Sequence, residues 1–387
     1  MTKSRIPLKK FVKEYSVRNK LNEDIPVYSV TNSQGFCTEY FSKEVASQDK
    51  TTYKIVPRGY FAYNPSRINV GSVDWQKYED RVIVSPLYNV FSVSDEIDCQ
   101  YLYYFFRSNI GRQMIKAKSS GSVRDNLKIE MLKEMTIPDI SMREQQFCSS
   151  VLDKLQILIK LKFDEIKQMD ELVKARFVEL FGDPYFNPYK WKKLKIADAV
   201  TVEPQNGLYK PQTDYIIDGT GIPILRIDCF YNGEVADWGM LKRLRCTEKD
   251  IKRYQLNDDD IVINRVNSIE YLGKCAHITG MKEKTVFESN MMRMHFDKSR
   301  FNPIYITKLL CTQYIHDQII KHAKKAVNQA SINQHDVMDF DIYLPPLNMQ
   351  QEYANFVRQI AKSKAVIEKS LKELETLQAS LMQKYFS

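Results

Sequence analysis

The chain carries an internal repeat, and this feature constrains its fold more than any other. Residues 127–181 match residues 332–386 at a constant offset of 205, with Gln145-Gln146 falling on Gln350-Gln351 and Phe181 on Phe386. An ungapped match over about 55 residues is hard to obtain by chance, and self-similarity at a fixed spacing is the signature of a duplicated structural unit. We therefore expect the 387 residues to form two copies of the same structural unit.

Upstream of these segments the offset drifts, as insertions in surface loops would make it. Asn64 in the run YFAYNPSR matches Asn264 in DIVINRVN at an offset of 200, and Leu8 matches Leu194 at 186. Each half thus has a globular part of variable length followed by a tail of fixed length. Because loops tolerate change better than the elements they connect, the globular parts should share a framework and differ in their surface residues.

Both tails are expected to be long helices that pair as a coiled coil. In the second tail, apolar residues recur every seven positions from Ile360 to Leu381, and the first tail has a similar spacing. The alternative is that each helix packs only on its own domain, but neither domain needs a helix of about 38 residues and about 57 Å. The residues expected in the helix pair are Leu155, Ile159, Phe163, Ile166, Ile360, Ile367, Leu371, Leu374 and Leu381.

The globular parts combine short strands with helices. Residues 53–63 and 258–266 have strand-like patterns, and residues 101–118 and 305–325 have helical ones. This predicts an α+β chain with two similar mixed α/β domains, at 1–140 and 183–345. Each domain is followed by a long helix, at 141–182 and 346–387, and the two helices are expected to run antiparallel in a pseudo-two-fold tandem repeat.

Composition excludes several classes of protein. A net charge of +9 permits a polyanionic partner such as nucleic acid without requiring one. Only 13 glycines are present, which counts against folds built on glycine-rich phosphate loops. The sequence shows no apolar stretch near the ~20 residues of a membrane span, no secretory signal, and no CxxC pair among its seven cysteines. We therefore expect a cytoplasmic protein without membrane contact, whose thiols are free and mostly buried.

Catalytic motifs are weak throughout. The runs DPYF at 183–186 and NPY at 187–189 resemble the signature of amino-methyltransferases but lack its second proline, which favours an inter-domain linker. Pro138-Asp139 with Glu165 and Lys167 fits a loose nuclease pattern, but the latter two fall on the polar side of a predicted helix rather than around a metal. The five histidines lack ligand spacing, and no phosphate-binding loop is visible. We expect no catalytic residue and no metal site.

What remains is a set of polar and cationic residues on loops of the two globular parts. Lys suits phosphates, Arg suits guanine, and Asn or Gln suits adenine. Each residue alone is more often an ordinary surface group, but the two halves carry such residues at matching places. The candidate DNA contacts are Asn64, Ser66, Arg67, Lys116, Lys118, Ser120 and Arg124 in the first half, and Asn206, Tyr209, Lys210, Arg226, Asn264, Arg265, Asn267, Lys324, Asn328 and Gln329 in the second.

Three features resemble the specificity subunit of type I restriction–modification systems: the turns IPDISMREQ and IYLPPLNMQQE, the segment ELFGDP with the later Trp191 and Leu194, and the stretch NGLYKP at 206–211. The resemblance covers essentially the whole chain, although IPDIS replaces the proline-rich turn in the first repeat. It implies a non-catalytic subunit in which each globular part is a target recognition domain for one half of a split, asymmetric sequence in double-stranded DNA.

The same resemblance implies partners. The helix pair would space the two domains and dock two modification (methyltransferase) subunits, and restriction (motor–nuclease) subunits would join the complex. S-adenosylmethionine, ATP and Mg would lie on those partners, with no cofactor in this chain. Independently, two similar domains on paired helices match two half-sites on DNA, as a dimer would. Two alternatives stay open: the recognition part of a combined restriction–methylation enzyme, and a coiled-coil scaffold protein.

Overall fold

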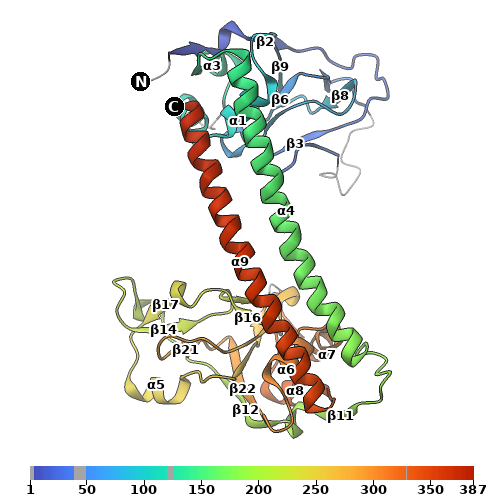
Figure 1. Ribbon diagram of the computed structural model, residues 1–387, viewed down its shortest axis with the longest axis vertical. Helices are drawn as coiled ribbons and strands as arrows, with labels where there is room; N and C mark the ends of the chain where they lie inside the picture. Colours follow the sequence, from blue (N-terminus) through green and yellow to red (C-terminus); the bar gives the residue numbers. More distant parts are fainter. Residues whose placement is uncertain (1–3, 39–48, 120–125, 328) are drawn as a thin grey trace. The chain divides into compact units, whose positions relative to one another are not determined.

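The computed structural model describes residues 4–38, 49–119, 126–327 and 329–387, and the chain divides into two compact units. Unit 1 comprises residues 1–166 and 366–387, and unit 2 comprises residues 167–365. Both boundaries fall inside long helices, α4 (Met142–Phe181) and α9 (Leu347–Phe386), drawn green and red in Figure 1. Each unit therefore contains part of both helices.

Unit 1 is built on a four-stranded antiparallel sheet with the order β2 (Val12–Tyr15), β9 (Asn89–Val93), β6 (Phe61–Tyr63), β7 (Val73–Trp75). The rings of Phe61 and Phe91 stack 5.0 Å apart beneath the helices, because both residues are cross-strand neighbours on the buried face. Among its described residues the unit also has the strand pairs β1 (Arg5–Pro7) with β10 (Thr136–Pro138), β3 (Ser29–Thr31) with β4 (Gly35–Cys37) and β5 (Lys54–Pro57) with β8 (Arg81–Val84), and the α-helices α1 (Cys99–Arg107), α2 (Asn109–Ser119) and α3 (Ile129–Lys133).

Unit 2 repeats this sheet and adds a second one. The repeated sheet has the order β12 (Val200–Asn206), β22 (Met291–Phe296), β18 (Ile261–Asn264), β20 (Cys275–His277), again antiparallel. The added sheet has the order β13 (Tyr215–Ile216), β17 (Lys242–Leu244), β14 (Ile222–Leu225), β21 (Val286–Phe287). The smaller elements are β11 (Lys192–Lys195) with β25 (Asp341–Leu344), β15 (Phe230–Tyr231) with β16 (Glu234–Val235), β19 (Val266–Asn267), β24 (Ala330–Ser331) and β23 (Lys324–Lys325), and α5 (Glu248–Tyr254), α6 (Pro303–Leu310), α7 (Gln313–His322) and α8 (Gln334–Met338).

The shared sheet confirms the predicted repeat. Strands β6 and β18 hold the same position in their sheets, and Asn64 and Asn264 mark the C-terminal end of each strand. The first strand of each half also pairs with the strand that precedes its long helix, β1 with β10 and β11 with β25. An α+β fold with two similar domains follows, and the extra sheet of unit 2 accounts for its longer globular part.

The two long helices occur as predicted and run antiparallel within each unit. In unit 1 the Nε2 of Gln378 lies 3.1 Å from the Oε1 of Gln156, and in unit 2 the Nζ of Lys364 lies 2.8 Å from the Oδ1 of Asp170. The expected contact residues are buried or half-buried, except Phe163, which is 52% exposed. Phe163 does not pack in the helix pair, because the inward positions of α4 run through Ile159, Lys162 and Ile166 and leave Phe163 one position off this row. Its part in subunit docking stays a prediction.

Two predicted helical stretches are interrupted. The stretch 101–118 breaks at Ser108, where α1 ends and α2 begins at Asn109. The stretch 305–325 breaks at Cys311 and Thr312, between α6 and α7, and Lys324–Lys325 forms strand β23. The helix-forming pattern was correct, but capping ends each helix early: the Oγ of Ser108 accepts the N–H of Gly111, and that of Thr312 donates to the carbonyl of Leu309.

Each unit has its own hydrophobic core, and both cores include the end of a long helix. In unit 1, Phe386 is fully buried among residues of α1, and the Nη1 of Arg5 donates to its carbonyl at 2.7 Å. In unit 2, Phe181 is buried beside Tyr305 of α6. Within the described part of the chain, no helix is both long enough and apolar enough to cross a bilayer.

Candidate nucleic-acid interface

In unit 1, three predicted DNA contacts lie together just after strand β6. The Oδ1 of Asn64 accepts the N–H of Ser66 at 3.0 Å, and the Oγ of Ser66 lies 2.7 Å from the Oδ1 of Asn126. Arg67 is exposed, and all three residues line a polar hollow of about 370 Å³ together with Asn32 and further residues of the neighbouring loops. The side chains of this hollow can donate and accept hydrogen bonds, which base edges and phosphates require.

The other candidates of unit 1 lie on and after α2. Lys116 is exposed in the last turn of this helix. Lys118 pairs with Glu134 at 2.8 Å, and this hydrogen bond lowers the pKa of the Glu134 carboxyl. Its charge is therefore partly balanced within the protein, whereas that of Lys116 points to solvent. Ser120 and Arg124 lie outside the residues that the structure describes.

In unit 2, Asn264 differs sharply from its counterpart. It is fully buried at the end of β18, and its side-chain amide has no hydrogen-bond partner within the described residues. Because this side chain is buried, Asn264 does not reach a base directly in this conformation, contrary to the prediction of a direct contact. Its neighbour Arg265 is half-buried and donates from Nη1 to the carbonyl of Ser289 at 3.2 Å.

A small sheet brings the next candidates of unit 2 together. Strand β19, which contains Asn267, pairs with β24, and β24 pairs with β23, which begins at Lys324. Gln329 is exposed directly before β24, in the connection between these two strands. Asn267, Lys324 and Gln329 thus belong to one local structure, although more than 50 residues separate the first two. Asn328 lies outside the described residues.

The remaining candidates of unit 2 follow strands β12 and β14. Asn206 is exposed at the end of β12, and Tyr209 is 77% exposed. Lys210 pairs with Asp250 at 3.0 Å, and that hydrogen bond raises the pKa of the lysine. Arg226 donates to the hydroxyl of Tyr215 at 3.3 Å.

The buried carboxyl of Glu288 connects this region to Arg265. Its Oε1 accepts the N–H of Ile227, the residue after Arg226, and burial raises the pKa of the Glu288 carboxyl. Burial lowers the pKa of the Arg226 guanidinium, but the nearby groups Glu288, Tyr215 and Asp228 raise it by more. The net effect is a raised pKa for Arg226. The adjacent Ser289 donates its N–H to Leu208 and accepts from Arg265. One turn therefore positions the backbone beside Tyr209, Arg226 and Arg265.

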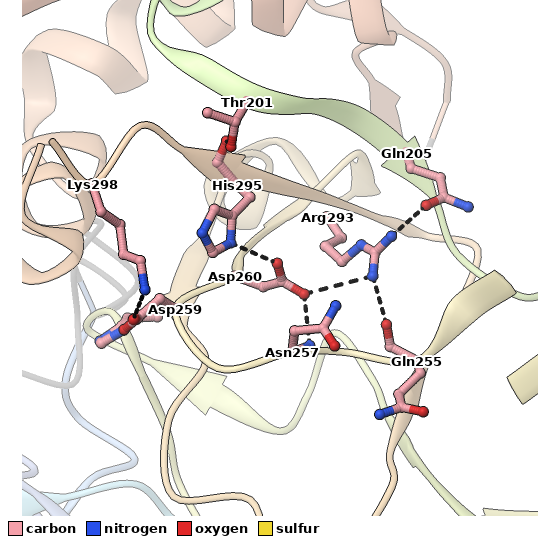
Figure 2. A network of polar contacts seen from close by, with 10 residues as sticks. Thr201, Gln205, Gln255, Asn257, Asp259, Asp260, Arg293, His295 and Lys298 are labelled. Carbon is pink, nitrogen blue, oxygen red and sulfur yellow. Dashed lines mark hydrogen bonds and ion pairs between the residues drawn. The ribbon is translucent and has the colours of Figure 1, made fainter. Parts of the chain in front are cut away.

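Sequence reasoning missed the polar network behind this surface (Figure 2). Asp260, directly before β18, accepts the N–H of Asn257 at 2.7 Å and lies 3.1 Å from the Nδ1 of His295. The Nη1 of Arg293 lies 3.7 Å from the same carboxyl, and its Nη2 donates to the Oε1 of Gln205 at 2.7 Å. Because Gln205, Arg293 and Asp260 belong to β12, β22 and the start of β18, the network fixes three strands of the sheet.

No sequence signal reveals this network, because Asp260 lies 33 residues from Arg293 and 35 from His295, and Gln205 lies 88 residues from Arg293. Burial raises the pKa of the Asp260 carboxyl, against the opposing effects of its hydrogen bond from Asn257 and the charge of Arg293. The side chains of Asp260 and Arg293, at the centre of this network, are largely buried. Its role in the site is to hold the strands that carry Asn206 and Arg265.

Lys274 is a second residue that the sequence did not reveal. Its ammonium lies 3.9 Å from the ring centre of Tyr231 and 4.9 Å from that of Phe230. Burial lowers the pKa of this lysine, while the faces of the aromatic rings favour the cation. The backbone carbonyl of Lys274 accepts the N–H of Asn264. The aromatic contacts of the Lys274 side chain therefore help to hold the residue that bonds to the end of β18.

A family model described as type I restriction modification DNA specificity domain matches this chain twice, at residues 6–169 and 188–376. Among curated relatives, a putative type I restriction enzyme specificity subunit (MjaX) of Methanocaldococcus jannaschii is 30% identical over 203 residues, covering 52% of this chain and 46% of the relative. The EcoKI specificity subunit of Escherichia coli is 26% identical over 306 residues, covering 74% of this chain and 64% of the relative. The chain thus spans about half to two thirds of the length of these relatives.

Two solved structures share the fold. A type I restriction–modification S subunit from M. genitalium aligns with a TM-score of 0.58 at 14% identity, covering all of this chain and 96% of that one. A chain from a structural study of the assembly and conformational transition of a type I system aligns with a TM-score of 0.59 at 14% identity, covering 99% and 97%. The two family matches fall on the two repeats that the sheet topology defines, and the chain belongs to the family of type I restriction–modification DNA specificity proteins.

Proposed function

We propose that this chain is the recognition subunit that selects the DNA target of a type I restriction–modification complex, with unit 1 reading one half-site and unit 2 the other. The observation that carries the proposal is the shared sheet. Strands β6 and β18 hold the same place in it, yet they lead into different polar residues, Asn64 to Arg67 in one unit and Asn264 to Asn267 in the other. Equivalent frameworks with different side chains read different sequences, so the target is bipartite and asymmetric.

The contacts within each unit favour a division of labour. Lys116 and Lys324 are exposed lysines, suited to phosphate contacts that set register. Arg265 follows β18 directly and Arg67 comes four positions after the end of β6, and both carry planar donor groups suited to the major-groove edge of guanine. We assign sequence readout to the two arginines, and affinity to the lysines.

The helices α4 and α9 are proposed to dock the modification subunits. In unit 1, α4 exposes large apolar side chains at Ile157, Leu158, Leu161 and Phe163. Ile157, Leu158 and Leu161 fall within about 100° of the helix circumference, and an exposed apolar stripe of this kind favours a protein–protein interface over a solvated helix face. Phe163 is also exposed but lies about 120° or more around the helix from these residues, so it is not part of this stripe.

Chemistry is proposed to belong to the partners. S-adenosylmethionine would bind the modification subunits, and ATP and Mg the restriction subunits, with no cofactor held by this chain. In the described residues, Glu165 pairs with Lys162 at 2.9 Å on the helix surface, an ordinary contact between neighbouring turns. The protein is accordingly proposed to be a DNA reader and not an enzyme.

The proposal is tested by co-expressing the chain with its modification subunit in a host that lacks other methyltransferases. Methylation-aware sequencing should find one asymmetric, two-part motif. Methylation without sequence preference would contradict the proposal, and methylation by this chain without a partner would favour a combined enzyme. DNA binding should also weaken with salt, with a slope of about −0.9 in log K per phosphate neutralised.

The docking surface has its own test. Leu161→Asp and Ile157→Asp place a charge in the proposed apolar interface and should reduce co-purification of the modification subunit. Leu21→Asp, at a leucine elsewhere in unit 1 that is 83% exposed, serves as the control and should leave assembly unchanged. Equal assembly of all three variants with the modification subunit would refute this interface.

A further inference from the structure

Two cysteines of unit 2 lie in direct contact although they are 36 positions apart. The Sγ of Cys275 lies 3.4 Å from the Sγ of Cys311. Cys275 is buried in strand β20, and Cys311 is exposed at the end of α6. All seven cysteines are reduced in the structure. Only a small displacement separates the two sulfurs from bonding, since a disulfide requires about 2.05 Å between them.

Small molecules can reach this pair from one side. Cys311 lines a cavity of about 620 Å³ in unit 2, together with Asn232, Glu234 and Lys308. The loop at Gly233 passes over the sulfur so closely that a methyl group at this glycine would lie 3.5 Å from the Sγ of Cys311. Cys311 therefore faces a space that admits a small reagent, whereas Cys275 lies behind it.

The environment distinguishes the two thiols chemically. Lys308 donates to the carbonyl of Asn232 at 2.7 Å and lies 3.3 Å from Glu234, which fixes its ammonium beside the pair. The hydrogen bond from Cys275 and the cation of Lys308 lower the pKa of the Cys311 thiol. The pKa of the Cys275 thiol is raised, by its hydrogen bond to Cys311 and by burial. An accessible thiol with a lowered pKa next to a protected thiol is the arrangement of an attacking and a resolving cysteine.

We propose that Cys275 and Cys311 form a reversible redox site that low-molecular-weight disulfides oxidise. The Sγ thiolate of Cys311 attacks one sulfur of the reagent, whose S–S bond breaks and releases one thiolate. That thiolate takes the proton of Cys275. The Sγ of Cys275 then attacks the Sγ of Cys311 in the mixed disulfide and expels the second small thiolate. Two protein thiols are oxidised and one small disulfide is reduced. The second small thiolate takes up from water the proton that Cys311 released on ionising, so two small thiols result.

The resulting disulfide bond would lie within unit 2. It joins β20, which pairs with β18, to the chain segment after α6. The structure already holds these segments together, because the Cys275 thiol also lies 3.7 Å from the carbonyl of Thr307. Oxidation is therefore expected to leave the fold unchanged and to cross-link it.

The test uses the full-length reduced chain, titrated with oxidised glutathione under native conditions. Intact mass and peptide mapping should show the loss of two thiols per chain and a cross-link between the peptides of Cys275 and Cys311, reversed by a dithiol reductant. Cys246→Ser, a half-buried cysteine elsewhere in unit 2, is the matched control and should oxidise like the unaltered chain. Lys308→Gln should slow the reaction and Lys308→Arg should retain it.

The single variants separate the two roles. Cys275→Ser should trap glutathione on Cys311, and Cys311→Ser should neither cross-link nor take up glutathione at Cys275. If Cys275→Ser lowers the melting temperature, Cys275→Ala replaces it, since alanine removes the sulfur without adding a buried hydroxyl. A stable glutathione adduct on the unaltered chain, a cross-link between other cysteines, or no loss of thiols would each overturn the proposal.

Discussion

Phe386 packs its ring 4.9 Å from that of Tyr101, although 285 residues separate them in the sequence. The same relationship recurs in unit 2, where Phe181 lies 4.7 Å from Tyr305. Phe181 and Phe386 are equivalent in the repeat, as the last residues of α4 and α9. Each long helix thus completes the core of the unit that contains the other repeat's globular part. The two repeats exchange helix ends.

Removing one of these rings should destabilise one unit selectively. Phe386→Ala deletes a fully buried aromatic side chain from unit 1 and should cost about 3–5 kcal/mol of local stability. Hydrogen exchange should show faster amide exchange in β6 and β9 of unit 1, with β18 and β22 of unit 2 unchanged. Phe186→Ala, at a phenylalanine that is 80% exposed, is the control. Equal loosening of both units would contradict the exchange of helix ends.

The helix pair should be sensitive to the buried position and tolerant at the exposed one. Leu371 is buried in α9 and packs in the heptad row, whereas Leu377 is 46% exposed on the same helix. Leu371→Ala should lower the free energy of unfolding by about 2–4 kcal/mol, and Leu377→Ala by less than about 1 kcal/mol. Urea unfolding of both variants measures the difference. Similar losses would mean that the heptad row does not define the buried side of α9.

Arginine substitutions should separate the two half-sites. Arg67→Ala should reduce discrimination at one half of the motif, and Arg265→Ala at the other, each by about 1–3 kcal/mol for the base concerned. Methylation of a DNA library by the assembled complex gives the preference at every position. Exposed Lys252→Ala in α5 serves as a neutral control for surface charge. If a single substitution relaxed specificity in both halves of the motif, the proposal that each unit reads one half-site would be contradicted.

Acid should reveal the buried carboxyl of Asp260. Burial raises its pKa above the ordinary value of 3.8, so the folded chain binds this proton more tightly than the unfolded chain does. The contribution of Asp260 to stability is then complete below pH 3.8 and falls as the pH rises through the folded pKa. Asp260→Asn cannot titrate, so its stability relative to the unaltered chain should improve as the pH rises through this window and stay constant above it.

Urea unfolding at a series of pH values measures this difference. Asp297→Asn provides the contrast, because hydrogen bonds from Ser299 lower the pKa of that exposed carboxyl. For Asp297 the contribution is present above pH 3.8 and lost as the pH falls, the opposite sign. If both variants showed the same pH trend, burial would not be the factor that sets the pKa of the Asp260 carboxyl.

The repeat offset alone predicted much of the fold. Constant spacing between Gln145 and Gln350 placed both long helices, and the pairing of Asn64 with Asn264 identified equivalent strands. The exchange of helix ends was not predictable in the same way. A heptad pattern reports which face of a helix is apolar and not which globular part receives its last turn.

The candidate site was predicted less well, for a related physical reason. Residue type indicates what Asn264 could bind, but its burial depends on Lys274 and on strands whose order only the fold determines. The network around Asp260 and Arg293 gave no signal because its members are far apart in sequence. Phe163 fitted the approximate spacing of the first tail, yet a shift of one position turns a helical side chain by about 100°.

The contact between Arg5 and the carbonyl of Phe386 bears on how the chain matures during synthesis. Domains generally fold in order of emergence from the ribosome, the N-terminal one first. Here unit 2 has all of its residues once position 365 has been translated, whereas unit 1 waits for residues 366–387. Unit 1, whose globular part is synthesised first, therefore completes its core last, because Phe386 can join that core only after the final turn of α9 has been translated.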